Sequence, residues 1–360
     1  MYGVFELRGK KVSPKLAARA GVSPELTVIG RTADRRTIVA GGNKFDATSM
    51  SLFPGYLLPT RQGQTVSEIV AKISATKSVD SECQNEADLL QELSGRAGFP
   101  AVVHRGQAAV RYDDRPSFLS ATKNVSRQAP FFIMPRIGGL DLDLFRLKQS
   151  DPAEASRKKL ALITGQLMPA LADRVVELHE RNIVHRDIKP NNVLYDPAAN
   201  ILTVLDFGRA ARLDAVEART DHGAFPYVPP ELMLETPDRE DVRVDVFGFG
   251  ATYYTLLTGR LGLEYEGVGN IWRLTGLDLM FISQEEVVKR FCREQLQLGT
   301  LGYAALVERI KMPNELKQSE LGKYLVRLVH PIKTERPASM GEVAETIKRL
   351  GAQFNQGSSL

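Results

Sequence analysis

The sequence predicts an α+β fold of two lobes, a small strand-rich lobe followed by a larger and mainly helical lobe. Short apolar stretches separated by polar turns fill much of residues 51–134, as is typical of short strands. From about residue 150 onward, apolar residues recur at three- and four-residue intervals, which indicates helices. Pro135–Gly139, rich in residues that interrupt regular structure, would join the two lobes.

Composition excludes several classes of protein. The chain has 360 residues, 43% hydrophobic and 25% charged, as in an ordinary globular protein. Its net charge of +4 is too small to indicate nucleic-acid binding. No apolar run approaches the roughly 18 residues that a membrane span requires, and Met1–Lys11 does not have the pattern of a signal peptide. We therefore expect a cytoplasmic protein that binds neither nucleic acid nor membrane.

Residues 1–50 differ from the rest of the chain in composition, so we interpret them as a divergent N-terminal extension that can also form part of the small lobe. Leu26–Ile29 and Thr37–Ala40 flank a polar turn and predict a hairpin. Residues 1–44 carry an excess of basic side chains, which form either a solvated surface or a docking patch for an acidic partner. These basic residues are Arg8, Lys10, Lys11, Lys15, Arg19, Arg31, Arg35, Arg36 and Lys44.

Residues 51–134 are assigned to the small lobe. Tyr56–Pro59 and Ile69–Ile73 have the composition of strands around a turn, and Ala101–Val103 and Phe131–Met134 are further strand candidates. Ser81–Leu93 has helical spacing, with its apolar residues on one face.

Residues 135–350 are assigned to the large lobe, and 351–360 to a flexible tail. Ser156–Arg181 predicts a long helix that Pro169 kinks or divides. Later helices are expected at Asp245–Thr258, Gln284–Leu296, Leu321–Val329 and Met340–Leu350.

The strongest chemical signal is the stretch His185–Asn192, which follows the long helix and leads into the apolar Val193-Leu194. A second motif, Asp206-Phe207-Gly208, ends the strand-like Leu202–Leu205. The intervening turn predicts a hairpin flanked by the two motifs.

These residue types suit phosphoryl transfer, which needs a proton acceptor, metal ligands and cationic support for the phosphate. Asp187 would orient and deprotonate the attacking hydroxyl, and Lys189 would lie against the transferred phosphate. Asn192 and Asp206 offer the oxygen ligands that Mg²⁺ (or Mn²⁺) prefers.

With these motifs the sequence resembles the eukaryotic-type protein kinase family over roughly residues 51–350. Tyr227–Glu231 resembles the end of a kinase activation segment, with Pro229 where Ala is usual. Asp245–Gly250 resembles the start of the helix whose Asp braces the catalytic loop. Glu335–Pro337 resembles the motif whose Arg pairs with the Glu that ends the activation segment. The resemblance therefore implies a bracing role for Asp245 and a structural ion pair between Glu231 and Arg336.

The same resemblance suggests how the small lobe would hold ATP. Ile69–Ile73 is similar to the strand that bears the ATP-anchoring lysine, here Lys72. A lysine in an apolar run needs a partner, and Glu86, on the following predicted helix, matches the family's regulatory Glu. Lys77 is a competing candidate, but it lies in a polar stretch.

The glycine-rich phosphate loop is the main departure from the family pattern, because nothing before Lys72 fits G-x-G-x-x-G. The preferred placement lays Ser51–Leu57, with Gly55 as its glycine, over that loop; Gly41–Phe45 is the alternative. The resemblance further implies that backbone groups at Met134 and Ile137, in the connection between lobes, bind the adenine edge.

Acceptor choice and regulation leave alternatives open. Lys189 resembles the lysine of Ser/Thr-specific kinases, yet Ala224 replaces the threonine that normally braces the catalytic residues. Arg186 precedes the catalytic Asp, as in kinases switched by phosphorylation of the activation loop, and Thr220 is the candidate phosphosite. The loop could instead be ordered by acidic side chains, for which the candidates are Asp214, Glu217 and Asp221.

The function expected from the sequence is a Ser/Thr-type protein kinase that uses Mg-ATP, acts on an unidentified protein and can phosphorylate itself. One alternative is a pseudokinase or scaffold, and another is an ATP-dependent kinase or transferase with a non-protein acceptor. A divergent small lobe beside a well-matched large lobe would also suit an effector delivered into a host cell.

Overall fold

The structure is a computed structural model, and its chain divides into an N-terminal unit, Met1–Gly138, and a C-terminal unit, Gly139–Leu360. The residues it describes are 5–7, 9–41, 50–59, 64–114, 123–147, 153–214, 225–234, 241–261, 263–266 and 284–355. Several residues named in the sequence predictions lie outside the described residues, namely Arg8, Glu217, Thr220, Asp221, Ala224 and most of Gly41–Phe45.

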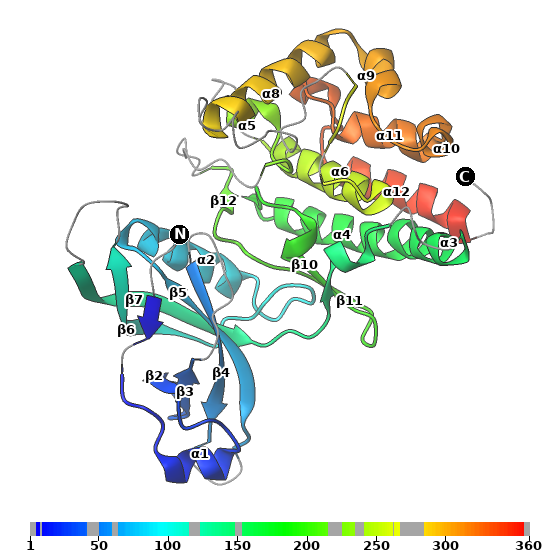
Figure 1. The fold of residues 1–360 in the computed structure, drawn as a ribbon. Coiled ribbons are helices and arrows are strands. Elements are labelled where there is room, and N and C mark those ends of the chain that lie inside the picture. Colours follow the sequence, from blue (N-terminus) through cyan, green and yellow to red (C-terminus); the bar gives the residue numbers. More distant parts are fainter. Residues whose placement is uncertain are drawn as a thin grey trace. The chain divides into compact units, whose positions relative to one another are not determined.

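The N-terminal unit is built on one antiparallel sheet of seven strands, in the order β1-β6-β7-β5-β4-β3-β2 (Figure 1). The strands are β1 Phe5–Leu7, β2 Thr27–Arg31, β3 Thr37–Ala40, β4 Met50–Leu58, β5 Ser67–Ser74, β6 His104–Asp114 and β7 Lys123–Pro135. The predicted hairpin is present as β2 and β3. Through β1, β2 and β3, the residues before 51 pair into the same sheet as β4 and β5.

One face of this sheet carries the core of the unit. Strands alternate in side-chain direction, so every second residue of β3, β4, β5 and β7 reaches this face. The buried residues that form it include Ile38, Phe53, Leu57, Ile69, Ile73, Val110, Phe131 and Ile133. Ile29 of β2 joins the same cluster, and a Cβ on Gly30 would lie only 3.4 Å from the Phe131 ring. The sheet therefore curls until β2 approaches β6, and this encloses the core.

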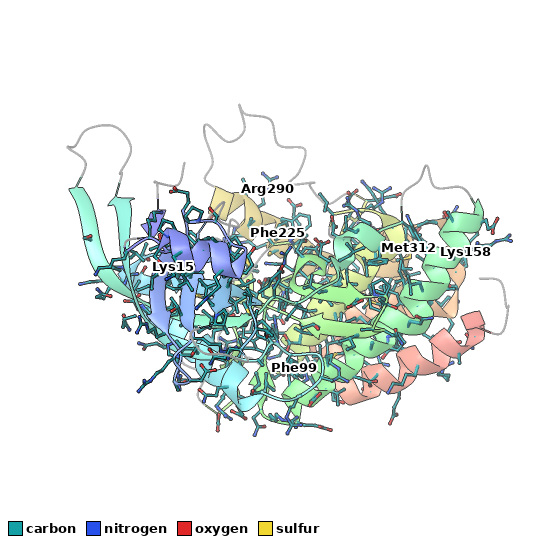
Figure 2. The ribbon with its side chains drawn as sticks, turned by 90° about the horizontal axis from the view of Figure 1, so that it is seen from below. Lys15, Phe99, Lys158, Phe225, Arg290 and Met312 are labelled. Atoms are coloured by element: carbon teal, nitrogen blue, oxygen red, sulfur yellow. The ribbon has the colours of Figure 1, made fainter. Side chains whose placement is uncertain are left out.

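Two helices, α1 Pro14–Ala20 and α2 Asp80–Glu92, accompany the sheet. In α1, Ser13 is the N-cap, and its hydroxyl accepts a hydrogen bond from the Leu16 N–H. The helix packs around Val39 and Leu58, while Lys15 on its outer side is exposed (Figure 2). The predicted helix Ser81–Leu93 matches α2 to within one residue at each end.

One predicted strand of this unit is displaced. Ala101–Val103 is irregular, and β6 begins at His104. Pairing with β7 nevertheless starts at Val103, whose N–H donates to the Ile133 carbonyl at 2.9 Å. The strand lies later than predicted because β6 is defined by its long pairing with β7, not by its own apolar content.

The C-terminal unit is mainly helical (Figure 1). Its helices are α3 Ala153–Leu162, α4 Met168–His179, α5 Pro230–Met233, α6 Arg243–Thr258, α8 Gln284–Thr300, α9 Tyr303–Arg309, α10 Asn314–Gln318, α11 Glu320–Leu328 and α12 Met340–Asn355. Its short strands are β8 Leu140–Asp141, β9 Ile183–Val184, β10 Val193–Asp196, β11 Ile201–Val204 and β12 Ala211–Arg212. Single helical turns lie at η2 Leu142–Phe145, η4 Pro190–Asn192 and η6 Lys333–Glu335. The helix α12 continues through Asn355, so residues 351–355 are helical and not part of a flexible tail.

Pro169 divides the long predicted helix, as expected. A π-helical turn, Ile163–Leu167, lies between α3 and α4, and Pro169 is in the first turn of α4. Proline lacks the N–H that would bond to the carbonyl four residues earlier, so the preceding turn can widen. Lys158 on α3 projects outward, 77% exposed (Figure 2).

The centre of this unit is α6, which is buried from Val244 through Leu257. Glycines allow its close packing: a Cβ on Gly250 would lie 2.6 Å from Leu328 Cβ of α11. A Cβ on Gly248 would lie 3.1 Å from the Ile188 carbonyl oxygen, so the catalytic-loop candidate rests directly on α6. Among the described residues no helix is long and apolar enough to cross a membrane.

Candidate active site

Lys72 of β5 and Glu86 of α2 form a buried ion pair in the N-terminal unit. Lys72 Nζ lies 2.7 Å from both carboxylate oxygens of Glu86, and the two side chains are 4% and 1% exposed. Burial of either charge alone would be costly, so each stabilises the other in place. The competing candidate Lys77 is exposed, in the single turn η1 Lys77–Val79.

An apolar strip lies beside this ion pair on the same face of the sheet. Leu52 is directly opposite Lys72, Pro54 is opposite Val70, and Val70 is in turn opposite Met134. Cross-strand partners share a face, and Lys72 and Val70, two residues apart, share one as well. Leu52, Pro54, Val70 and Met134 are all half-buried, unlike the fully covered residues of the opposite face. A flat aromatic ligand could cover this strip.

The preferred placement of the phosphate loop at Ser51–Leu57 is wrong. These residues lie inside β4, and Gly55 is opposite Ala40 of β3. Gly55 is needed there for packing, because a Cβ would overlap the Val39 carbonyl oxygen and lie 3.2 Å from Ala40 Cα. Gly41, in the alternative stretch, is the last described residue after β3, with a left-handed φ of 157°.

Gly55→Ala should therefore destabilise the fold by about 1–3 kcal/mol, the usual cost of overpacking. Thermal unfolding of the two proteins measures this. Gly341→Ala in α12, where the nearest atom would lie 3.6 Å from the new Cβ, is the matched control and should not lower stability. An unchanged unfolding temperature for Gly55→Ala would contradict the strand packing.

In the C-terminal unit, Asp245 of α6 holds the start of the catalytic loop. Its carboxylate accepts hydrogen bonds from the N–H groups of His185 (2.8 Å) and Arg186 (2.7 Å). His179 Nε2 lies 2.9 Å from the same carboxylate. Burial by itself raises the pKa of Asp245, but the hydrogen bond and charge of His179, together with His185, lower it below its usual value. The loop backbone is thus attached to α6 by an ionised, buried carboxylate.

These bonds support an unusual backbone conformation. Arg186 has a φ of +66°, in the left-handed region that a residue with a side chain seldom adopts. The cost is offset by the hydrogen bonds that the N–H groups of His185 and of Arg186 itself donate to Asp245. Asp187, the next residue along, is positioned by this turn.

Asp187 lies at the centre of a small polar cluster. Lys189 Nζ is 2.7 Å from its Oδ2, and Asn192 Nδ2 donates to its Oδ2 and to its main-chain oxygen, each at 2.9 Å. The other carboxylate oxygen, Oδ1, is buried and accepts no hydrogen bond from the described residues. A buried carboxylate oxygen with spare acceptor capacity is suited to receive a proton from a hydroxyl group.

Asp206 follows β11 on a strained turn beside Asn192. Its φ is +64°, and the preceding Leu205 donates its N–H to the Asn192 carbonyl at 2.8 Å. His185 Nε2 bonds to the Leu205 carbonyl at 3.0 Å, and its ring stacks edge-on to Phe207. Since Asn192 Nδ2 is used by Asp187, its amide oxygen and the Asp206 carboxylate are the oxygen donors that this turn offers to a hard cation.

Glu231 and Arg336 form a second buried ion pair, between residues 105 positions apart. The guanidinium binds both carboxylate oxygens, at 2.6 and 2.8 Å, and also donates to the carbonyls of His330 and Pro331. It lies over the Phe247 ring of α6. The pair thereby ties the end of the Tyr227–Glu231 segment to α6 and to the loop before α12.

Sequence reasoning missed Arg209. Its Nη1 lies 3.8 Å from Asp187 Oδ1, so a second cation faces the carboxylate opposite Lys189. Arg209 directly follows the motif Asp206-Phe207-Gly208, and its position in the chain is the only sequence signal that could have indicated it.

Met134 and Ile137, the residues expected to bind the adenine edge, both lie at the end of the N-terminal unit. Met134 is in β7, next to the fully buried Phe132 and Ile133, and Ile137 is half-buried in the irregular stretch after β7.

Three kinds of comparison relate the chain to known proteins. A family model described as protein kinase domain matches residues 64–289. The chain is 37% identical over 100 residues to the dual specificity mitogen-activated protein kinase kinase jkk-1 of Caenorhabditis elegans, covering 27% of this chain and 23% of that protein. It is 42% identical over 99 residues to the calcium/calmodulin-dependent protein kinase cmkA of Emericella nidulans, covering 26% and 23%. The chain thus matches less than a quarter of the length of either relative.

Among solved structures, the Cydia pomonella granulovirus kinase PK-1 resembles the chain with a TM-score of 0.51. The match covers 84% of this chain and 91% of that one, at 18% sequence identity. At this identity the likeness concerns the fold alone.

Proposed function

The chain belongs to the protein kinase family, and from this membership we propose that it transfers the γ-phosphate of ATP to hydroxyl groups of proteins, with Ser or Thr as acceptor. The observation that carries the proposal is the Asp187 carboxylate. One of its oxygens is bound by Lys189 and Asn192, and the other is buried with no hydrogen bond from the described residues. The incoming hydroxyl would donate to the second oxygen, and Lys189 would face the transferred phosphate.

The nucleotide would be held by residues with complementary chemistry. Lys72, kept in place by Glu86, would contact the phosphates of ATP. The apolar strip of Leu52, Pro54, Val70 and Met134 would cover the adenine ring, with backbone groups near Met134 and Ile137 at its polar edge.

Asn192 and Asp206 fit a divalent cation of the Mg²⁺ or Mn²⁺ type, because both supply oxygen atoms and no softer ligand accompanies them. A bound ion would neutralise charge on the phosphates of ATP. The hydrogen bond from the Leu205 N–H to the Asn192 carbonyl holds the two segments that bear these side chains next to each other.

Acceptor type and regulation extend the proposal. Lys189, bound to Asp187, supports Ser or Thr as the acceptor. The protein would also phosphorylate Ser or Thr residues of its own chain. Two forms of regulation are compatible with the proposal. In one, Thr220 is phosphorylated and its phosphate pairs with Arg186; in the other, the acidic residues Asp214, Glu217 and Asp221 order the loop.

We propose two kinds of partner, a protein substrate and an acidic docking partner. A protein substrate follows from the family's chemistry, and the basic residues of 1–44 would form a docking surface for an acidic partner. Lys11 and Arg19 donate to the backbone carbonyls of Glu25 and Pro59, and these bonds do not pair them with a carboxylate. Delivery into a host cell as an effector stays a prediction from the sequence, since neither the fold nor these relatives bear on it.

Phosphate transfer from labelled ATP, with mapping of the acceptor residues by mass spectrometry, tests the proposed function. We expect Lys72→Met to lower incorporation about 10²–10³-fold, the usual effect of removing one preorganised cation or donor at a phosphate. Lys77→Met is the matched control, because Lys77 is exposed, and should label like the wild type.

Each alternative has its own outcome in this assay. ATP binding without transfer to any acceptor would replace the proposal with a scaffold. Transfer to a small molecule and not to protein would point to a non-protein acceptor. Equal labelling of wild type and Lys72→Met would remove Lys72 from the site.

A further inference from the structure

A small pocket lies on the C-terminal unit, between α9, α11 and α12, among residues that the proposed kinase function does not use. Its volume is about 210 Å³. It is lined by Tyr303, Glu320, Lys323, Tyr324, Arg327, Thr346 and Arg349. A cavity of this size suits one small polar group, since drug-sized ligands occupy larger ones.

The lining residues form two aligned stripes. Glu320, Lys323, Tyr324 and Arg327 recur along α11 at intervals of three, one and three residues, and so share one face of that helix. Thr346 and Arg349, three residues apart, form the facing stripe on α12. The geometry of two helices thus concentrates three cationic side chains around one pocket.

The charge of the pocket is positive. Three cations face a single lining carboxylate, Glu320, which is bound by Arg349. Arg327 pairs with Glu342 at 3.2 Å, outside the lining. Lys323 makes no ion pair with the described residues, and it stands four residues before Arg327, a spacing at which like charges repel. Anion binding would relieve that repulsion.

Neutral donors complete the pocket. The Tyr324 hydroxyl is buried, and its neighbour among the described residues is the Thr346 hydroxyl. Burial raises the pKa of this hydroxyl, so it keeps its proton at neutral pH. Tyr303 and Thr346 already donate, to the carbonyls of Lys323 and Glu342. Lys323 can therefore donate to a ligand, Arg327 can add its remaining N–H groups, and Tyr324 can turn its hydroxyl from Thr346 toward the ligand.

We propose that this pocket binds a phosphate dianion. Two N–H-bearing cations and one hydroxyl match the charge and the three acceptor oxygens of such a group. The dianion can come from free inorganic phosphate or from a phosphorylated side chain of a protein. Binding at this pocket does not depend on the proposed transfer reaction.

Calorimetric titration of the full chain tests the proposal with two probes, inorganic phosphate and a peptide that contains phosphoserine. We expect Lys323→Ala and Arg327→Ala each to weaken binding about tenfold, as removal of a charge-assisted hydrogen bond does. Binding should also weaken as salt is added, because the lining cations are exposed. Lys348→Ala is the charge-matched control: it lies on α12, pairs with Asp173 and does not line the pocket.

The result also separates the two sources. Equal affinity for both probes assigns the pocket to free phosphate, whereas tighter binding of the phosphopeptide than of phosphate and of the unphosphorylated peptide assigns it to a phosphoprotein. Absence of saturable binding with either probe, or equal binding by wild type and the Lys323→Ala/Arg327→Ala variant, would overturn the proposal. Asp187→Asn should bind both probes like the wild type, so loss of catalysis and loss of this pocket remain distinguishable.

Discussion

Asp187→Asn is expected to lower phosphate transfer about 10²–10⁴-fold, the range over which a positioned general base contributes. The substitution keeps the shape of the side chain but removes its negative charge and half of its acceptor capacity. The orphan oxygen Oδ1 could then no longer take a proton from a hydroxyl, and Lys189 would lose its counter-charge at 2.7 Å. Single-turnover transfer from labelled ATP measures the effect.

The fold should survive this change. Asn192 would still donate to the main-chain oxygen of residue 187, and Asp245 would still hold the loop through His185 and Arg186. ATP binding, followed by thermal shift, should therefore persist in the variant.

Asp196→Asn is the matched control for this experiment. Asp196 ends β10 in the hairpin between the two motifs, and its carboxylate accepts from the N–H groups of Ala198 and Ala199. An Asn oxygen can accept the same bonds, so this variant should transfer phosphate normally. Equal transfer by wild type and Asp187→Asn would remove Asp187 from the catalytic site.

Arg336→Met is expected to destabilise the C-terminal unit by about 3–5 kcal/mol, the cost of leaving one member of a buried ion pair without its partner. Arg336 is fully buried, and its loss would leave Glu231 and the carbonyls of His330 and Pro331 without their donor. For a unit of this size the unfolding temperature should fall by roughly 6–20 °C. Calorimetry is the suitable measurement, because a chain of two units can unfold in more than one step.

A second variant separates the charge from the packing. Adding Glu231→Leu to Arg336→Met removes the stranded carboxylate, so part of the lost stability should return, although the two backbone carbonyls stay unpaired. Arg290→Ala on α8, which breaks an exposed pair with Glu294, should change stability little (Figure 2). If Arg336→Met unfolded at the wild-type temperature, the pair would not have the structural role assigned to it.

Local pattern was a reliable guide wherever a segment buries one face of its own. The helices α2, α6, α8, α11 and α12 all begin within four residues of their predicted starts. Pro169 interrupts its helix because proline lacks the backbone N–H, and this can be predicted from the one residue alone. The motif around Asp187 could be identified because its chemistry needs particular side chains at close spacing, and the turn that presents them is local.

Other features depend on contacts that no local pattern carries. Gly55 was assigned to a loop because glycine is common in loops, but it lies in β4. A glycine is needed there because β3 approaches too closely for a Cβ. The long strand β6 was predicted only as the short stretch Ala101–Val103 that precedes it, since its partner β7 and not its own sequence determines it. Arg209 comes near Asp187 only once the chain has folded. The pocket around Lys323 likewise forms only once α11 and α12 have packed together.

The sequence by itself therefore determined the family, the helices and the residues of the catalytic loop, because these follow from periodicity and from side-chain chemistry within short stretches. Only the tertiary structure decided that Lys72 and not Lys77 is buried against Glu86, and that residues before 51 pair into the same sheet. It also decided that one oxygen of Asp187 accepts no hydrogen bond from the described residues. Each of these depends on burial and on hydrogen-bond partners, which exist only once the chain has folded.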